Sequence, residues 1–415
     1  MLVAVRRFFA ALIAAGALSP VATGTATAAE PKVFLLDGSQ LIQTRQRVRG
    51  GDKDLAPAVA ELVQQADRAL AAGPFSVINK DATPPSGDKR DYMSLAPYWW
   101  PDPATPDGLP YIRRDGERNP EIHSLRNRLD LGEMVDAVET LALAYYFTAD
   151  EKYASRAAVL IRHWFLDPAT GMIPNLQYAQ AIRGRNEGRG EGLIETRTLT
   201  RIVDSIGLLA GSRAWSAEDQ QESEEWFKKF LNWMLKSALG QDEASAENNH
   251  GTFYDVQAAC YALFVGKRDV ARKILQMAGN RRIAVQIAPD GSQPLELDRT
   301  KAWSYSVGNL AGLMALARLG EHVDLDLWRY ETEDGRSIRK ALDFLAPFGT
   351  GDRAWPHQQI NGWSPDIFYP MLRLAAAKYP NGPYGVMVAK LPSRSAADGA
   401  LWTSPIEPIN DLHRR

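Results

Sequence analysis

The sequence is poor in cysteine and histidine and carries little net charge. Cys260 is the only cysteine among 415 residues, so no intrachain disulfide can form, and its apolar neighbours indicate a buried, unreactive thiol. The six histidines include no His-x-x-x-His pair, which disfavours a zinc enzyme. The formal net charge of −2 argues against a nucleic-acid partner, although a local cluster of arginines would still suit a polyanion.

Long apolar runs are missing after the N-terminus. Residues 1–28 combine two arginines, the apolar run Phe8–Leu18 and the small residues Ala26-Thr27-Ala28, which together predict a cleaved signal peptide too short for a good membrane span. Cleavage leaves 415 − 28 = 387 residues with a formal charge of 46 − 50 = −4. We therefore expect residues 29–415 to form one exported domain, periplasmic or secreted, without a membrane span. The oligomeric state stays open, with a monomer as the default.

Strand-like alternation is rare, and apolar residues recur at helical spacing over most of the chain. The segment 284–288 fits either a strand or a helix end. Successive helical pairs joined by polar or glycine turns suggest an all-α fold, an (α/α) toroid with an inner and an outer ring of helices. The predicted helices cover residues 57–72, 129–147, 151–165, 193–209, 219–239, 249–265, 268–278, 302–319, 338–348 and 367–378.

Two long segments interrupt the helices. Residues 76–119 are dense in proline, which forbids a long helix, and residues 166–191 are rich in glycine and arginine. Loops of this length inside one domain are usually functional. We expect both to lie at one end of the toroid, over its axis.

The stretch Glu247–Asp255 places two amides and an imidazole directly before an apolar helical run. Free backbone N–H groups at a helix N-terminus attract anions. His250 and Tyr254 are four residues apart and share one face of a helix that has begun by His250. From this stretch alone, a second interpretation stays open, in which Asn248 or Asn249 only caps the helix.

A second polar stretch, Glu296–Ser306, is a charged run that ends in the hydroxyl of Tyr305. Together the two stretches supply asparagine, histidine, arginine and tyrosine. Such a set is able to bind a carboxylate and to transfer a proton.

With these stretches in view, the sequence resembles the alginate lyase family. The resemblance extends from about Tyr92 to about Ile360. It implies an (α/α) toroid, an acidic polysaccharide as substrate, cleavage of uronic-acid polymers by β-elimination, and no metal or organic cofactor. It is carried by Tyr92–Pro103, Arg118-Asn119-Pro120, Asn248-Asn249-His250-Gly251 and Glu296–Lys301.

The resemblance implies four catalytic residues. Asn249 and Arg299 neutralise the uronate carboxylate, and His250 and Tyr305 transfer protons. In mannuronate and glucuronate the C5 hydrogen and O4 lie on the same face, so Tyr305 both takes and returns the proton. In guluronate they lie on opposite faces, so His250 is the base and Tyr305 the acid. We expect Arg299 to lower the pKa of Tyr305 from its reference value of about 10.

The spacing of two of these residues departs from the family pattern. Arg299 and Tyr305 are six residues apart, whereas the family pattern has seven, which would place both on one helix face. Six residues on one helix would separate them by about 120°. Either the helix begins after Arg299, or the chain is a divergent branch with another substrate preference.

Substrate contacts are expected from further aromatic and polar side chains near the proposed loops. The aromatic residues Tyr98, Trp99 and Trp100 are suited to stacking on sugar rings, with burial in the core as the alternative for the tryptophans. His357 has a purely structural role as its alternative. The expected substrate-binding residues are Tyr98, Trp99, Trp100, Gln180, Arg183, Tyr254 and His357.

Competing functions remain at this point. Alginate of the mannuronate type is the leading substrate, and glucuronan is a rival because mannuronate and glucuronate differ only at C2. A toroidal glycoside hydrolase would need two carboxylates across the cleft, such as Asp102 with Glu296. A binding protein without turnover would not have His250 and Tyr305 facing one another.

Overall fold

The structure, a computed structural model, describes residues 30–391. The expected signal peptide therefore lies outside the described residues. Within residues 30–391, no helix has the length and apolar character needed to cross a membrane.

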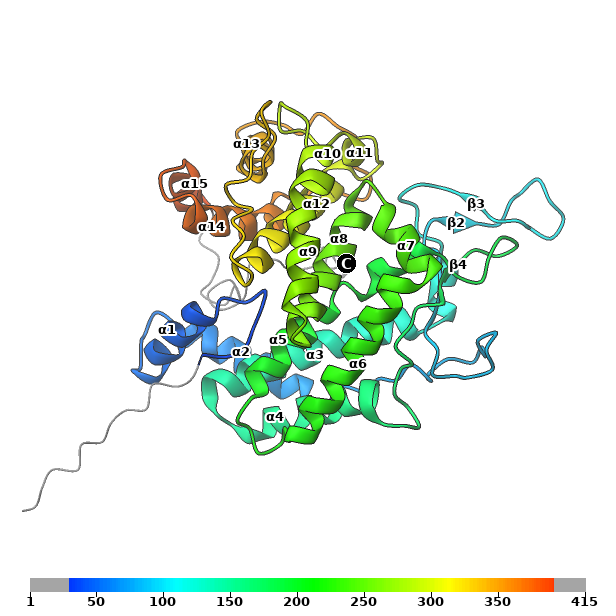
Figure 1. Cartoon of the computed structure of the whole chain (residues 1–415), viewed down its shortest axis with the longest axis horizontal. Coiled ribbons are helices and arrows are strands. Elements are labelled where there is room, and N and C mark those ends of the chain that lie inside the picture. The colour runs from blue at the N-terminus through cyan, green and yellow to red at the C-terminus, as the bar shows by residue number, and fades with distance from the viewer. Residues whose placement is uncertain (1–29, 392–415) are drawn as a thin grey trace, which may run out of the picture.

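Four helices form the centre of the fold, three of them nearly fully buried and the first with 13 of its 22 residues buried (Figure 1). They follow one another in space as they do in sequence, because each packs against the next. The last three are apolar on nearly every side, as expected for helices that are covered by neighbours all round. The central helices are α3 (Asn127–Thr148), α5 (Leu199–Leu209), α8 (Asn249–Phe264) and α12 (Ala302–Glu321).

Amphipathic helices cover this central row. α4 packs on α3, α6 and α9 pack on α8, and α13 packs on α12. Each has one buried face and one solvated face, which is the pattern of an outer helix. The predicted all-α toroid of helical hairpins is confirmed. The outer helices are α4 (Glu151–Ile161), α6 (Ala217–Lys236), α9 (Arg268–Ala278) and α13 (Ile338–Gly349).

Smaller helices complete the fold, and some differ from the prediction. The helix α1 was not predicted. The predicted helix 219–239 divides into α6 and α7, because the Ser237 side chain caps α7 by accepting from the N–H of Gly240. The ambiguous segment 284–288 contributes a short helix. These elements are α1 (Gly38–Arg49), α2 (Ala56–Ala69), α7 (Ala238–Ser245), α10 (Ala284–Gln286), α11 (Pro294–Leu297), α14 (Tyr369–Lys378) and α15 (Tyr384–Lys390).

Between the helical turns that border them, the two predicted loops contain only short strands. β1 pairs in parallel with β4, which joins the proline-rich loop to the glycine- and arginine-rich loop, and β2 pairs antiparallel with β3. Figure 1 shows both loops on the same side of the helices. The strands are β1 (Met93–Leu95), β2 (Trp99–Trp100), β3 (Ile112–Arg113) and β4 (Tyr178–Ala181).

The single cysteine lies in the middle of α8. Cys260 is fully buried, and burial raises the pKa of its thiol well above the ordinary value. The expectation of a buried thiol is confirmed.

Candidate active site

A cavity of about 490 Å³ lies where the N-terminal ends of the four central helices meet. Arg128 is the second residue of α3, Arg197 comes just before α5, Asn249 is the first residue of α8, and Lys301 directly precedes α12. All four line the cavity. Because a helix N-terminus carries partial positive charge, this arrangement favours an anion in the cavity.

The side chains that line the cavity add to this positive potential. Three are carboxylates, Glu191, Asp242 and Glu243, and seven are permanently basic. Such an excess raises the local concentration of a polyanion even though the whole chain is nearly neutral. The basic residues are Arg113, Arg118, Arg128, Arg189, Arg197, Arg299 and Lys301.

The two adjacent asparagines have different tasks. The Asn248 side chain accepts from the backbone N–H of His250 at 3.1 Å and caps α8. Asn249 donates through its backbone N–H and through Nδ2 to the two oxygens of buried Glu296, each at 2.7 Å. The first N–H groups of α8 are therefore occupied by protein side chains, and the expectation that they bind an anion directly is wrong. The two hydrogen bonds to Glu296 fix the Asn249 amide at the cavity wall.

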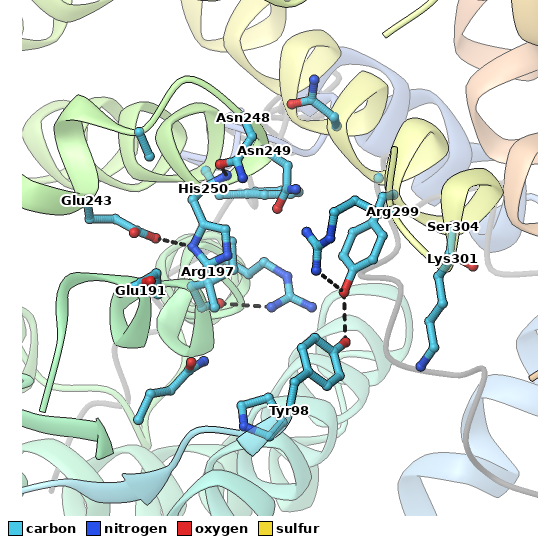
Figure 2. Close-up of a pocket in the computed structure, with 18 of the residues that line it drawn as sticks. Tyr98, Glu191, Arg197, Glu243, Asn248, Asn249, His250, Arg299, Lys301 and Ser304 are labelled. Carbon is cyan, nitrogen blue, oxygen red and sulfur yellow. Dashed lines mark hydrogen bonds and ion pairs between the residues drawn. The ribbon is translucent and has the colours of Figure 1, made fainter. Parts of the chain in front are cut away.

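The His250 ring is held by a buried carboxylate. Its Nδ1 lies 2.7 Å from Oε1 of Glu243, which projects from α7 and is 2% exposed (Figure 2). Burial raises the pKa of Glu243, and His250 partly opposes this shift. An ionised carboxylate only accepts hydrogen bonds, so Nδ1 carries the proton and Nε2 of a neutral ring is the free acceptor. Since His250 lines the cavity, this arrangement prepares it to take a proton.

Tyr305 lies within a network of three partners. Arg299 Nη2 is 3.1 Å from Tyr305 Oη, and the guanidinium carbon lies 4.1 Å from the centre of the ring. Tyr98 Oη is 2.8 Å from Tyr305 Oη (Figure 2). Asp115 accepts from Arg299 at 2.7 to 3.1 Å and orients it. The helix α12 begins at Ala302, after Arg299, and this explains the six-residue spacing.

The pKa of Tyr305 differs from the expectation. Burial raises it well above the ordinary value, and the neighbouring Tyr98 raises it further. Arg299 lowers it, as expected, but does not outweigh burial. The predicted net decrease is therefore wrong. Asp115 contributes to this result, because its carboxylate offsets part of the Arg299 charge.

Three of the expected substrate-binding residues line the cavity together with the four catalytic candidates: Tyr98, Trp99 and Gln180. Gln180 is 4% exposed, has a positive φ of 51°, and accepts from Arg189 through Oε1 at 2.6 Å. A buried, strained amide held by an arginine is a fixed part of the wall and not a mobile loop residue.

Trp100 and Arg183 do not line this cavity. Trp100 follows Trp99 on β2, and successive strand residues point to opposite faces. Its indole donates to the carbonyl of Glu117 at 3.0 Å. Arg183 is paired on the surface with Glu121, at 2.5 Å. The expectation that these two residues face the cavity is corrected by strand geometry and by ion pairing.

Tyr254 and His357 also lie outside the cavity lining. Tyr254 is 4% exposed and donates to the carbonyl of Met234 at 2.9 Å. It therefore contributes to the contact between α6 and α8 and does not share the cavity with His250. His357 packs on the Trp355 ring, with 5.0 Å between the ring centres, which corresponds to its structural alternative.

Several lining residues were missed by sequence reasoning. Glu243 is seven residues before His250, on a different helix, so no single-helix pattern links them. Arg118, Arg128 and Arg197 come from a loop, from α3 and from the segment before α5. Arg118 belongs to a motif that supported the resemblance, but nothing in the sequence placed it in the site.

The geometry also bears on the competing functions. Asp102 does not line the cavity, and Glu296 is 1% exposed and occupied by Asn249. The carboxylate pair expected for a glycoside hydrolase is therefore not formed by these two residues. His250 and Tyr305 line the same cavity, in contrast to the expectation for a binding protein. In the part of the chain that the structure describes, no group of three or more histidine, cysteine, aspartate or glutamate side chains is arranged to hold a metal ion.

The family model that matches this chain and three similar solved structures are all those of alginate lyases. The family model described as alginate lyase matches residues 76–355. The crystal structure of an alginate lyase from Bacteroides ovatus is 40% identical, with a TM-score of 0.86, and the match covers 90% of this chain and 99% of that one. No curated protein sequence matches.

Two more distant structures share the fold. Alginate lyase A1-III from Sphingomonas species A1 is 15% identical, with a TM-score of 0.52, over 86% of this chain and 90% of that one. A histidine-to-alanine variant of A1-III, complexed with a tetrasaccharide, is 14% identical, with a TM-score of 0.51, over 85% and 90% of the two chains.

Proposed function

Because the chain belongs to the alginate lyase family and is a polysaccharide lyase, we propose that it cleaves a β-1,4-linked polyuronate, alginate of the mannuronate type, by β-elimination. The product would carry a 4,5-unsaturated uronate at the new end. The observation that carries the proposal is the meeting of Tyr305, Arg299, His250 and Asn249 in one cation-rich cavity. The 40% identical relative is itself an alginate lyase, which supports the substrate.

The first requirement of the reaction is to neutralise the C6 carboxylate, because its charge makes the C5 proton only weakly acidic. The Asn249 amide has two N–H bonds, and Glu296 accepts from Nδ2 through only one oxygen, Oε2. Arg299 contacts Asp115 and Tyr305 through Nε and Nη2. A second N–H of Asn249 and Nη1 of Arg299 are the donors proposed for the substrate carboxylate. Donors aimed at the developing enolate oxygen stabilise it directly.

In the syn reaction on mannuronate, Tyr305 performs both proton transfers. The phenolate takes the C5 proton, the C5–H electron pair becomes the C4=C5 double bond, and the C4–O4 bond breaks. Tyr305 then returns the proton to O4. Arg299 at 3.1 Å stabilises the phenolate.

In the anti reaction on guluronate, the roles are divided. His250 takes the C5 proton at Nε2 while Glu243 stabilises the imidazolium that forms. Tyr305 protonates O4, a task that suits its raised pKa. Glucuronan is the alternative substrate for the syn route, since it differs from polymannuronate only at C2.

Ultraviolet absorbance of the unsaturated uronate tests the proposal. Purified protein is incubated with polymannuronate, polyguluronate and glucuronan, each beside a Tyr305→Phe variant. We expect the strongest absorbance on polymannuronate and a loss of about 10²- to 10⁴-fold in the variant. Tyr379→Phe is the matched control, because its hydroxyl bonds the Trp328 carbonyl far from the cavity.

Each other outcome has a definite meaning. New reducing ends without absorbance on any polymer would sink the lyase proposal in favour of hydrolysis. Absorbance that survives in Tyr305→Phe would transfer the base to His250. Absorbance on glucuronan alone would correct the sugar and keep the reaction.

We also propose export to the periplasm or beyond, which the composition of residues 1–28 supports. Expression of the full chain and of residues 29–415 in a bacterial host tests this. The mature protein is expected outside the cytoplasm only when residues 1–28 are present.

A further inference from the structure

Three arginines gather in the cavity beside the proton-transfer residues. Arg118 comes from the loop after β3, Arg128 from the first turn of α3, and Arg197 from the segment before α5. All three line the cavity, and Figure 2 labels Arg197 among the residues of its wall. The fold thus brings three permanent positive charges together from positions up to 79 residues apart (197 − 118).

The protein offers little negative charge to this three-arginine cluster. Glu195 is the nearest carboxylate, with Oε1 3.7 Å from Arg128 Nη1, and both of these buried atoms lack a hydrogen-bond partner. The other oxygen of Glu195 accepts from the hydroxyls of Tyr92 and Ser94. Arg118 makes no hydrogen bond or ion pair with any residue between 30 and 391. Glu195 thus pairs with Arg128 only, and the Arg118 guanidinium has no partner among the described residues.

The three groups are close enough to repel one another. Burial lowers the pKa of Arg197 to about 10, and Arg128 and Arg118 contribute to the decrease. Burial also lowers the pKa of Arg118, again with a contribution from Arg128. A fold that concentrates like charges in this way has lower stability than one that disperses them, a cost that is usual at functional sites.

We propose that the three-arginine cluster binds the carboxylate of the uronate adjacent to the one that loses its C5 proton. This inference rests on the proposed function. Guanidinium groups bind carboxylates through paired N–H donors, and every sugar of a polyuronate carries one carboxylate. The reacting carboxylate already has Asn249 and Arg299, so the cluster supplies a second, separate anion site.

The position of Arg118 fits this assignment. It lines the same cavity as Tyr98 and Tyr305, so the second site shares the cavity with the proton-transfer centre. The consequence is a specificity rule. The enzyme requires an uninterrupted pair of uronates around the reacting bond and discriminates against a neutral neighbour.

Binding without turnover provides the direct test. In a Tyr305→Phe background, a tetra-uronate and its carboxyl-reduced, neutral counterpart are titrated by calorimetry. Arg118→Gln is expected to weaken binding of the acidic oligosaccharide about tenfold and to leave binding of the neutral one unchanged. Arg118→Lys is expected to recover part of the affinity. Arg329→Gln is the control for charge, because that side chain is 88% exposed on the surface.

Steady-state kinetics then separate the two carboxylate sites. Arg118→Gln in the active enzyme should raise KM about tenfold with kcat nearly unchanged. A fall in kcat at constant KM would overturn the proposal and assign Arg118 to the reacting carboxylate. Equal affinities of Arg118→Gln and the parent for the acidic oligosaccharide would also overturn it. Wild type that binds this oligosaccharide but does not cleave it would contradict the proposed function and leave the binding comparison valid.

Discussion

Arg282, which bonds the chain just before Asn248, and the three-arginine cluster, which lines the cavity, behave in opposite ways. Arg282 is 2% exposed and uses every nitrogen: Nε donates to Asp255 at 2.7 Å, Nη1 to the Ala246 carbonyl at 2.6 Å, and Nη2 to the Ala244 carbonyl at 2.8 Å. Arg118, in the three-arginine cluster, bonds no side chain or carbonyl in the described chain.

The difference teaches how to separate structural from functional charges. Arg282 fixes the carbonyls of Ala244 and Ala246, shortly before Asn248, and so helps to set where α8 begins. Gly251 makes room for it, since a Cβ there would lie 2.3 Å from Arg282 Nη1 and 2.0 Å from the Ala246 oxygen. The glycine of the Asn-Asn-His-Gly motif is thus explained by packing. Unlike Arg282, Arg118 has donors that bond no group of the described chain, so they are available to a ligand.

The largest effect is expected from a substitution of Arg282, whose nitrogens are all hydrogen-bonded. Arg282→Ala leaves Asp255 buried without a partner and should lower the free energy of unfolding by about 3–5 kcal/mol. Activity should fall as well, because Asn249 and His250 lose their support. Denaturant unfolding measures the first effect, with Arg329→Ala expected within about 0.5 kcal/mol of wild type. An unchanged midpoint would show that Arg282 is not the structural arginine.

Glu243→Gln tests a buried carboxylate whose hydrogen-bond partner, His250, lines the cavity. The amide oxygen still accepts from His250 Nδ1, but the negative charge that stabilises an imidazolium is lost. We expect kcat/KM to fall about tenfold where His250 is the base, which is the anti reaction on polyguluronate. The decrease on polymannuronate should be smaller. Equal decreases on both polymers would contradict the division of roles between His250 and Tyr305.

Tyr98→Phe tests the hydrogen bond between the two tyrosines. Burial and then Tyr98 raise the pKa of Tyr305, so removing the Tyr98 hydroxyl should lower it. The base form of Tyr305 is the phenolate, and its fraction increases with pH. The rising limb of kcat/KM against pH on polymannuronate should therefore move to lower pH, by about one unit. A shift toward higher pH would contradict this role of Tyr98.

The smallest effect is expected from Arg118→Gln on stability. Removing one of three mutually repelling charges breaks no hydrogen bond. The free energy of unfolding should stay the same or rise by up to about 1 kcal/mol. Thermal unfolding with and without the tetra-uronate measures this, and the ligand should stabilise wild type more than the variant. A clear loss of stability would place Arg118 beside Arg282 as a structural residue.

Much of the fold could be predicted because helical periodicity is a local property. Residues 268–278 and the start of α12 at Ala302 were predicted with the observed bounds. The capped split between α6 and α7 was missed, because Ser237 lies inside an otherwise continuous helical pattern. Asn249, His250, Arg299 and Tyr305 came from motifs, and the structure brings all four to one cavity. Their catalytic roles remain predictions.

The sequence by itself determined the helical character of the chain, the two long loops and the residue types available for chemistry. Only the tertiary structure decided which charges meet. Glu243 reaches His250 from a separate helix, Asp115 restrains Arg299 across 184 residues, and three arginines converge from three elements. The direction of the Tyr305 pKa shift was also decided by the tertiary structure. Burial raises the pKa of Tyr305 and the Arg299 charge lowers it, and both effects arise only when distant segments pack together.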